Sequence, residues 1–266
     1  MHSFPRCYSI PLRSYISRNI PNLKAGGRAL GASKLTMSSA RVMGTCSVGG
    51  QAMGTAAAFA ILKNCSLEDV DTRYIRELQQ QLLKDDCYIP GFKNEDTGDL
   101  ARLANVSASS EMPGCPAALV TNGVARSVDK ANVIHDEKHP VVESSNMWVS
   151  ASLSEGPQSL YLTLKERTNV RRVQITFDSN LSRSMKITMS SKRKAQQVLG
   201  APPELVKDYD IILFDGEKEV LRKSVRDNYQ RLNRIDFEET LCDKVQIRII
   251  STNGVSQARV FEVRIY

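Results

Sequence analysis

The sequence predicts an α+β protein of two domains, a helical segment over residues 1–105 and an all-β jelly-roll sandwich over residues 106–266. Glycines and alanines at helical spacing fill the stretch from Gly44 to Leu62, which predicts a helix. Short alternating apolar runs separated by turn residues occupy the second half and predict strands. Turn-forming residues from Tyr88 to Pro116 separate the two patterns and place the boundary near residue 105.

The small-residue helix carries the first candidate site. Gly50 and Gly54 lie four residues apart, so they share one face of the helix. That face suits close packing against another backbone, a flat ligand, or a partner helix inside a membrane. Gln51 and the threonines interrupt the apolar run, which is shorter than the ~20 residues a membrane span needs. We therefore predict no membrane span and leave the packing and ligand interpretations open.

A basic, acid-free segment precedes and includes this helix. The chain has no Asp or Glu before Glu68, whereas eight Lys and Arg residues lie in that stretch. Ala25-Gly26-Gly27-Arg28 ends a short apolar run at glycines, which permit positive φ and close approach of a ligand. Such a segment suits an anionic ligand such as a dinucleotide pyrophosphate. We predict no nucleic-acid partner, because aromatic residues are not interleaved and the remaining chain is nearly charge-balanced.

The cysteines and the N-terminus limit other classes of site. No C-x-x-C pair occurs, so no zinc site is predicted. Cys46 lies near the start of the helix, where a thiolate is favoured, but we expect it to be a small residue buried against the helix. No secretory signal is seen; Met1–Asn19 has the basic, acid-free composition of a transit peptide. A cytoplasmic and a periplasmic location both stay open. The six cysteines are Cys7, Cys46, Cys65, Cys87, Cys115 and Cys242.

The remaining elements follow from periodicity. Asp71 is the predicted N-cap of a packing helix in which Ile75, Leu78 and Leu82 share one face. Trp148 is predicted to anchor the core of the sandwich, and a short helix is expected within Arg193–Leu199. The predicted strands are Ser159–Leu164, Val170–Phe177, Asp210–Phe214, Glu219–Leu221, Val245–Ile249 and Val260–Ile265.

The stretch from Asn22 to Asn64 resembles the C-terminal flavin-contacting segment of a bacterial family of FAD-dependent oxidoreductases with a two-dinucleotide-type FAD domain. The upstream Tyr8–Ser14 resembles the strand that leads into that segment. The match runs in register without gaps through Asn22, Leu23, Gly27, Arg28, Ala32, Ser33, Arg41, Val42, Met43, Thr45, Cys46, Gly50, Gln51, Ala52, Gly54, Thr55 and Ala56–Ala58.

This resemblance implies FAD as cofactor and hydride transfer through flavin N5. Gly27 and Arg28 would approach the ribityl and phosphate end, while Arg41 and the helix N-terminus would face flavin N1 and the C2 carbonyl, where negative charge develops. Lys34-Leu35 stands where the family has His-Glu, so no catalytic residue is assigned. The implied cofactor-binding residues are Gly27, Arg28, Ser33, Arg41, Val42, Met43, Thr45, Cys46 and Gly50.

The ADP-binding half of such an enzyme is missing from this sequence. That half begins with a strand, a G-x-G-x-x-G turn and a helix, and no such motif occurs. We therefore expect the chain to be the C-terminal portion of an FAD-dependent oxidoreductase, inactive alone. Its partner would be the missing N-terminal dinucleotide-binding half, encoded by the same gene or supplied in trans.

The second half resembles the discoidin or coagulation-factor C-type fold, a galactose-binding-like jelly roll, over residues 115–266. The resemblance rests on Asn122-Gly123, Trp148, the alternating runs and Ala258-x-Val260-x-Glu262-Val263. It implies a glycan ligand, so an alternative function is a non-catalytic glycan- or surface-binding module. It also implies a structural Ca²⁺ with Asn122 and Glu262 as candidate ligands, although Asn122 replaces the usual Asp and Glu262 is equally a strand-edge charge.

Overall fold

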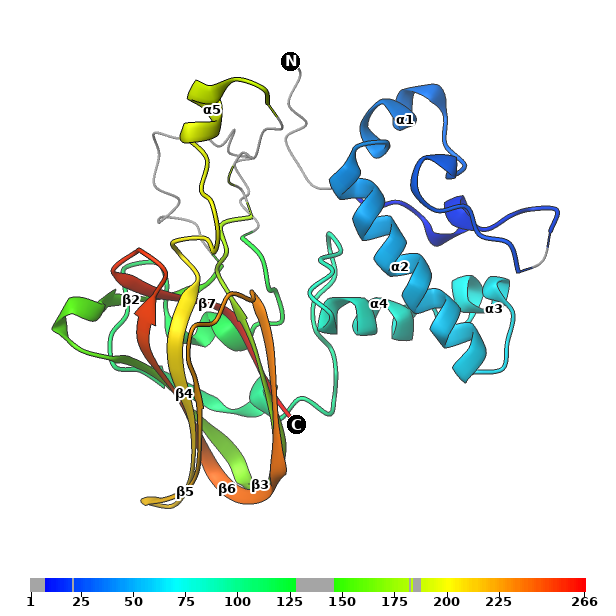
Figure 1. Cartoon of the computed structure of the whole chain (residues 1–266). Coiled ribbons are helices and arrows are strands. Elements are labelled where there is room, and N and C mark those ends of the chain that lie inside the picture. The colour runs from blue at the N-terminus through cyan, green and yellow to red at the C-terminus, as the bar shows by residue number, and fades with distance from the viewer. Residues whose placement is uncertain (1–7, 21, 128–145, 182, 184–187) are drawn as a thin grey trace. The chain divides into compact units, whose positions relative to one another are not determined.

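A computed structural model describes residues 8–20, 22–127, 146–181, 183 and 188–266 of the chain (Figure 1). The chain divides into two compact units, one spanning Arg6–Glu95 and the other containing Asp96–Tyr266. The first unit is helical and the second is built on an antiparallel sheet, so the predicted two-domain α+β layout is confirmed. The division after Glu95 lies upstream of the boundary predicted near residue 105. Cys7 lies outside the described residues.

The helical unit is organised around one long helix, α2, which begins and ends where the small-residue pattern predicts. Its core contains Leu12 and Tyr15 from the N-terminal turn together with Met53 of α2 and Leu78 and Leu82 from a later helix. The elements are the 3-10 helices η1 (Leu12–Tyr15) and η2 (Gly27–Ala29) and the helices α1 (Lys34–Ala40), α2 (Met43–Leu62), α3 (Leu67–Thr72) and α4 (Ile75–Lys84).

Two local predictions in this unit are wrong. Asp71 is not an N-cap, because it lies inside α3, which begins after Ser66. The Ser66 hydroxyl accepts a hydrogen bond from the Asp69 amide and the Asp69 carboxylate accepts one from the Ser66 amide, a capping box that fixes the earlier start. The strand expected over Tyr8–Ser14 is instead the 3-10 turn η1, whose N-cap Pro11 offers no N–H to a sheet.

The second unit consists of a seven-stranded sheet with order β2-β7-β3-β6-β4-β5, and β1 pairs with β3. The predicted strands over Ser159–Leu164 and Val170–Phe177 are one continuous strand, β3. The strands are β1 (Asn105–Ala108), β2 (Trp148–Ser152), β3 (Gln158–Phe177), β4 (Val206–Asp215), β5 (Lys218–Val225), β6 (Leu232–Thr252) and β7 (Gln257–Ile265), with η3 (Leu100–Leu103), η4 (Ala117–Thr121), η5 (Leu153–Glu155) and α5 (Ser191–Ala195) between them.

Strands β3 and β6 pair along nearly their full length and belong to both layers of the sandwich. The first half of β3 pairs with β1 and with the end of β6, from Gln158↔Ile249 to Thr163↔Lys244. Its second half pairs with β7 and with the start of β6. The register shifts between Thr163 and Thr168, where the paired strands pass from one layer to the other.

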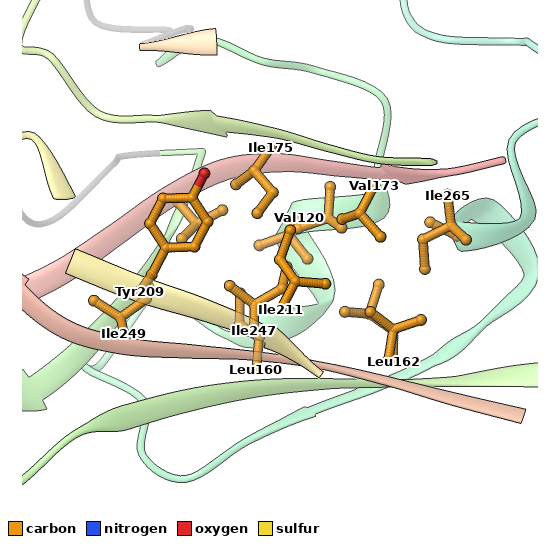
Figure 2. Close-up of a cluster of buried hydrophobic side chains, with 14 of the residues drawn as sticks. Val120, Leu160, Leu162, Val173, Ile175, Tyr209, Ile211, Ile247, Ile249 and Ile265 are labelled. Carbon is orange, nitrogen blue, oxygen red and sulfur yellow. The ribbon is translucent and has the colours of Figure 1, made fainter. Parts of the chain in front are cut away.

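The core lies between these two layers. Figure 2 shows Leu160, Leu162 and Ile247 facing Val173 and Ile265 across the interior. Trp148 is fully buried in the same cluster, as predicted, and its indole N–H donates to the Ser110 carbonyl at 2.9 Å. A buried Trp requires such a partner, because an unpaired N–H in the core is costly.

Candidate functional site

The junction between α1 and α2 holds most of the predicted cofactor-binding residues. Val42 is the N-cap of α2 in an extended conformation, and no side chain caps the helix. The first helical hydrogen bond joins the Cys46 amide to the Val42 carbonyl at 3.0 Å. The amides of Met43, Gly44 and Thr45 therefore precede the helical ladder and point outward from the positive end of the helix dipole.

Basic and hydroxyl groups flank this helix end. Arg41 is exposed, and its guanidinium has no partner among the described residues. The Ser33 hydroxyl is engaged locally, because it caps α1 by accepting from the Thr36 amide at 3.2 Å. The open Arg41 and the uncapped amides together form a site that favours negative charge.

The second predicted contact region, η2, lies against α2. Gly27 adopts a φ of +64°, which a residue with a side chain rarely takes, and Arg28 is exposed. No atom lies within 4 Å of where a Cβ on Gly26 or Gly27 would stand. The described residues therefore leave space beside this turn, and its contact with a ligand stays a prediction.

The glycines of α2 separate into one packed position and three open ones. A Cβ on Gly49 would meet the Tyr15 ring, with the hydroxyl oxygen at 2.4 Å. At Gly44, Gly50 and Gly54 nothing lies within 4 Å. Close packing thus occurs at Gly49, whereas the Gly50 and Gly54 face is not packed by described residues, and a ligand on that face stays a prediction.

The site lacks an obvious proton donor. Cys46 is half-buried and its thiol donates to the Ala40 carbonyl at 3.6 Å, so it packs against the helix junction. None of the three histidines of the chain lies between residues 8 and 95. Leu35, which replaces the family's acidic residue, is exposed on the first turn of α1. The arrangement favours a group that carries or gains negative charge, but its own described residues supply no acid–base pair.

The two candidate calcium ligands make separate contacts. The Asn122 amide donates to Asn146 Oδ1 at 2.6 Å and its carbonyl accepts from the Val124 amide at 2.9 Å. Glu262 is buried and pairs with Arg264, with 2.8 Å between Oε2 and Nε. No group of three or more His, Cys, Asp or Glu side chains suited to a metal occurs among the described residues. The calcium assignment stays a prediction.

A cluster that the sequence did not reveal lies at one end of the sandwich. It links Arg259 to Asp178 at 3.4 Å, Asn180 to Glu204 at 2.9 Å and Arg183 to Glu204 at 2.5 Å. Burial raises the pKa of Glu204, but hydrogen bonds and the Arg183 charge outweigh it, so the pKa lies below its usual range. The residues are far apart in sequence, and only the fold brings them together.

Several buried polar atoms in this end cluster have no hydrogen-bond partner. They are Glu204 Oε2, the Nε atoms of Arg183 and Arg259, and Ser179 Oγ. Two arginines balance two acids, so the cluster is neutral and offers both donors and an acceptor. Asn228 and Asn253 hydrogen-bond the backbone next to Glu204, which places the exposed Tyr229 in the neighbouring loop.

Comparison with known proteins identifies the first segment. Residues 1–82 match the family model described as FAD dependent oxidoreductase, and this range includes every residue predicted to hold the cofactor. The chain therefore carries an FAD-dependent oxidoreductase segment, as the resemblance implied, and FAD is the cofactor of that family. No curated protein matches the sequence.

Solved structures similar to this chain include sugar-binding modules. A fucose binding module of Streptococcus pneumoniae has 15% identity and a TM-score of 0.44, covering 65% of this chain and 97% of the module. Chitosan-binding module 1 of a chitosanase/glucanase from Paenibacillus sp. IK-5 has 15% identity and a TM-score of 0.42, with 63% and 98% covered. The family 32 CBM of NanJ from C. perfringens, solved with galactose, has 16% identity and a TM-score of 0.41, with 63% and 97% covered.

Helix α2 alone among the described elements is long and apolar enough to cross a membrane by length and composition. Only 17% of its apolar window is buried. The absence of a membrane span therefore stays a prediction.

Proposed function

We propose that residues 8–95 form the ring-contacting side of the site of an FAD-dependent oxidoreductase, closed by a dinucleotide-binding half outside this sequence. The observation that carries this is the uncapped start of α2 beside the free Arg41, within the segment that matches the family. The α2 amides and Arg41 would hold the pyrimidine side of the flavin, and Gly27 and Arg28 the ribityl end. When bound, FAD supplies hydride transfer.

The residues fit one end of the cofactor and not the other. Open space at Gly44 and Gly50 lets a planar ring approach the helix backbone. The phosphate-binding G-x-G-x-x-G turn does not occur in this sequence, so the motif that binds the ADP moiety of FAD is missing. We therefore infer that the isolated chain is inactive and that a second half supplies most of the affinity for FAD.

Flavin titration of the full chain tests this proposal. Measured by quenching of flavin fluorescence, FAD and riboflavin should bind with dissociation constants within about threefold of each other, because the chain lacks the G-x-G-x-x-G turn that holds a pyrophosphate most tightly. Adding the dinucleotide-binding half, in cis or in trans, should raise FAD affinity by orders of magnitude and leave riboflavin almost unchanged. Arg41→Gln should weaken both flavins, whereas Arg18→Gln, an exposed arginine of the same unit, should weaken neither.

Two results would contradict the proposal. A yellow chain with stoichiometric ~450 nm absorbance when purified alone would mean that the whole cofactor is held here. An added dinucleotide-binding half that leaves FAD affinity unchanged would mean that the two parts do not share one site.

We also propose that the sandwich binds a neutral glycan at its end cluster. The supporting observation is a neutral cluster in which the Arg183 side chain, paired with Glu204, is 32% exposed, with the exposed Tyr229 in the neighbouring loop. Sugar hydroxyls both donate and accept, and a sugar ring stacks on an aromatic face. Glycan-array binding that is lost in Tyr229→Ala and in Arg183→Ala, but kept in Arg171→Ala, supports the proposal. Binding that survives both loop substitutions contradicts it.

A further inference from the structure

The outer face of β4, β5 and β6 carries three arginines around one buried carboxylate. The neighbours of Asp210 on either side along β4 belong to the core, so Asp210 points to the opposite face. Arg248 lies directly beside Asp210 on β6, and Arg222 and Arg226 approach from β5 and the residue after it.

Asp210 is held mainly by one of these arginines. Arg226 Nη2 lies 2.8 Å from Asp210 Oδ1, whereas Arg222 and Arg248 Nη1 lie 3.3 and 3.7 Å from Oδ2. Burial alone would raise the pKa of Asp210. Hydrogen bonds from Arg226 and Ser224 and the arginine charges together outweigh burial, so the pKa lies below its usual value. The carboxyl is therefore ionised at neutral pH and acts as the fixed anion of the cluster.

Arg248 is the arginine with unused donors. Arg222 directs Nε and Nη2 to Glu219, and Arg226 also donates to two backbone carbonyls. The guanidinium of Arg248 makes only the 3.7 Å ion pair among the described residues, and its side chain is 41% exposed. Five N–H donors on a planar fork are thus available to a carboxylate in solution. Three cations face the two anions Asp210 and Glu219, which leaves an excess of one positive charge.

The next cross-strand row adds an amide and an aromatic ring. Gln246 lies two residues before Arg248 on β6, on the same face, and pairs with Tyr161 of β3. The Gln246 amide donates to Ser159 Oγ at 2.9 Å, and its carbonyl has no partner among the described residues. Tyr161 is half-buried, and no described residue bonds its hydroxyl. Diagonal neighbours on a sheet face lie ~7–8 Å apart, close enough for one pyranose ring to reach both Arg248 and Tyr161.

We propose that this face binds a uronic-acid residue of an acidic oligosaccharide. Its carboxylate would pair with Arg248, its hydroxyls with Gln246, and its ring would lie against Tyr161. The single excess charge suits one carboxylate. A nucleic acid needs a continuous basic surface to neutralise successive phosphates, and Asp210 and Glu219 interrupt this one.

Calorimetric titration of the full chain with trigalacturonate tests the proposal. Saturable binding should weaken at least about tenfold in Arg248→Gln, because a charge-assisted pair is lost. Arg248→Lys should fall in between, since it keeps the charge and loses the fork. Lys223→Gln is the matched control, because Lys223 pairs with the core residue Ile211 and so points to the other side of β5. Tyr229→Ala separates the two proposed glycan sites, because a loss of trigalacturonate binding equal to that in Arg248→Gln would place the ligand at the end cluster and contradict the proposal.

Several outcomes would overturn this inference. They are the absence of saturable uronate binding in the millimolar range, equal affinity for the matching neutral galactose trisaccharide, and tighter binding of an RNA oligonucleotide. Unchanged affinity in Arg248→Gln, with Trp148 fluorescence confirming a native sandwich, would overturn it too. Failure here leaves the flavin proposal standing, because Arg248 and Arg41 belong to different units.

Discussion

Replacing Gly49 with alanine should destabilise the helical unit, whereas the same change at Gly50 should stabilise it. A Cβ on Gly49 would stand 2.4 Å from the Tyr15 hydroxyl oxygen and 2.9 Å from Cζ, shorter than side chains tolerate. Tyr15 is only 4% exposed, so its ring has little room to withdraw. Nothing lies within 4 Å of the corresponding position on Gly50.

The magnitude follows from two opposing terms. Gly→Ala in a helix interior stabilises by about 1 kcal/mol, and this gain is common to both positions. Overpacking in a filled core costs about 1–3 kcal/mol and applies to Gly49 alone. The two variants should therefore differ by about 1–3 kcal/mol in the free energy of unfolding of the helical unit. For a unit of this size each kcal/mol moves Tm by about 4–8 °C.

Two spectroscopic probes separate the units within the intact chain. The long helices α2 and α4 belong to the first unit, so ellipticity at 222 nm reports mainly on it. The single Trp148 reports on the second unit and should not change. Tyr15→Phe combined with Gly49→Ala should recover part of the loss, because it removes the nearest clashing atom. Equal melting of the Gly49→Ala and Gly50→Ala proteins would refute the packing of Tyr15 against Gly49.

Four further predictions concern other contacts and the boundary between the two units. Glu262→Gln should cost the sandwich about 3 kcal/mol in urea unfolding, equally with and without Ca²⁺, because it leaves Arg264 buried without its carboxylate. Limited proteolysis should cut between Tyr88 and Glu95 and leave a resistant C-terminal piece, and an uncut junction would argue against two units. A chain starting at Asp96 should be monomeric and should unfold cooperatively on heating. Residues 1–95 should self-associate through the exposed side chains of Val48, Ile61 and Leu62, which size-exclusion chromatography would detect. The folded state lowers the pKa of Glu204, so its carboxylate should stabilise the sandwich at pH values above the unfolded-state carboxyl pKa of about 4.3. This stabilisation should be lost as the pH falls through the lower pKa of the folded state. Glu204→Gln should therefore make Tm depend less on pH in this range.

The sequence predicts best where one physical cause decides the structure. Helix α2 was found because glycines and alanines recur at helical spacing, and the later part of β6 because Val245, Ile247 and Ile249 alternate. The start of β6 was not predicted, since Asn233 occupies a buried position in a strand whose buried side chains are otherwise mostly apolar. The buried Asn233 side chain accepts a hydrogen bond from the Tyr209 hydroxyl at 3.0 Å, and local sequence patterns do not predict such a long-range contact.

The candidate sites differ in whether their residues lie close together in the sequence. Gly27, Arg41 and the start of α2 lie close together in the chain, so a local motif could identify them. The end cluster joins Asp178 to Arg259 and depends on strand pairing for its existence. A weak signal did exist on the outer face: Asp210 is an acid directly before the apolar run Ile211–Phe214, and a carboxylate buried there requires a cationic neighbour.

The placement of β7 determines when the sandwich can form during synthesis. It is the last strand of the chain, yet it lies between β2 and β3 in the sheet. The carbonyl of the terminal Tyr266 accepts hydrogen bonds from the Arg171 and Arg172 amides. The second unit therefore cannot complete its sheet until β7 has been synthesised and has inserted between β2 and β3. A chain cut before Gln257 would leave the edges of β2 and β3 unpaired and open to association with other chains.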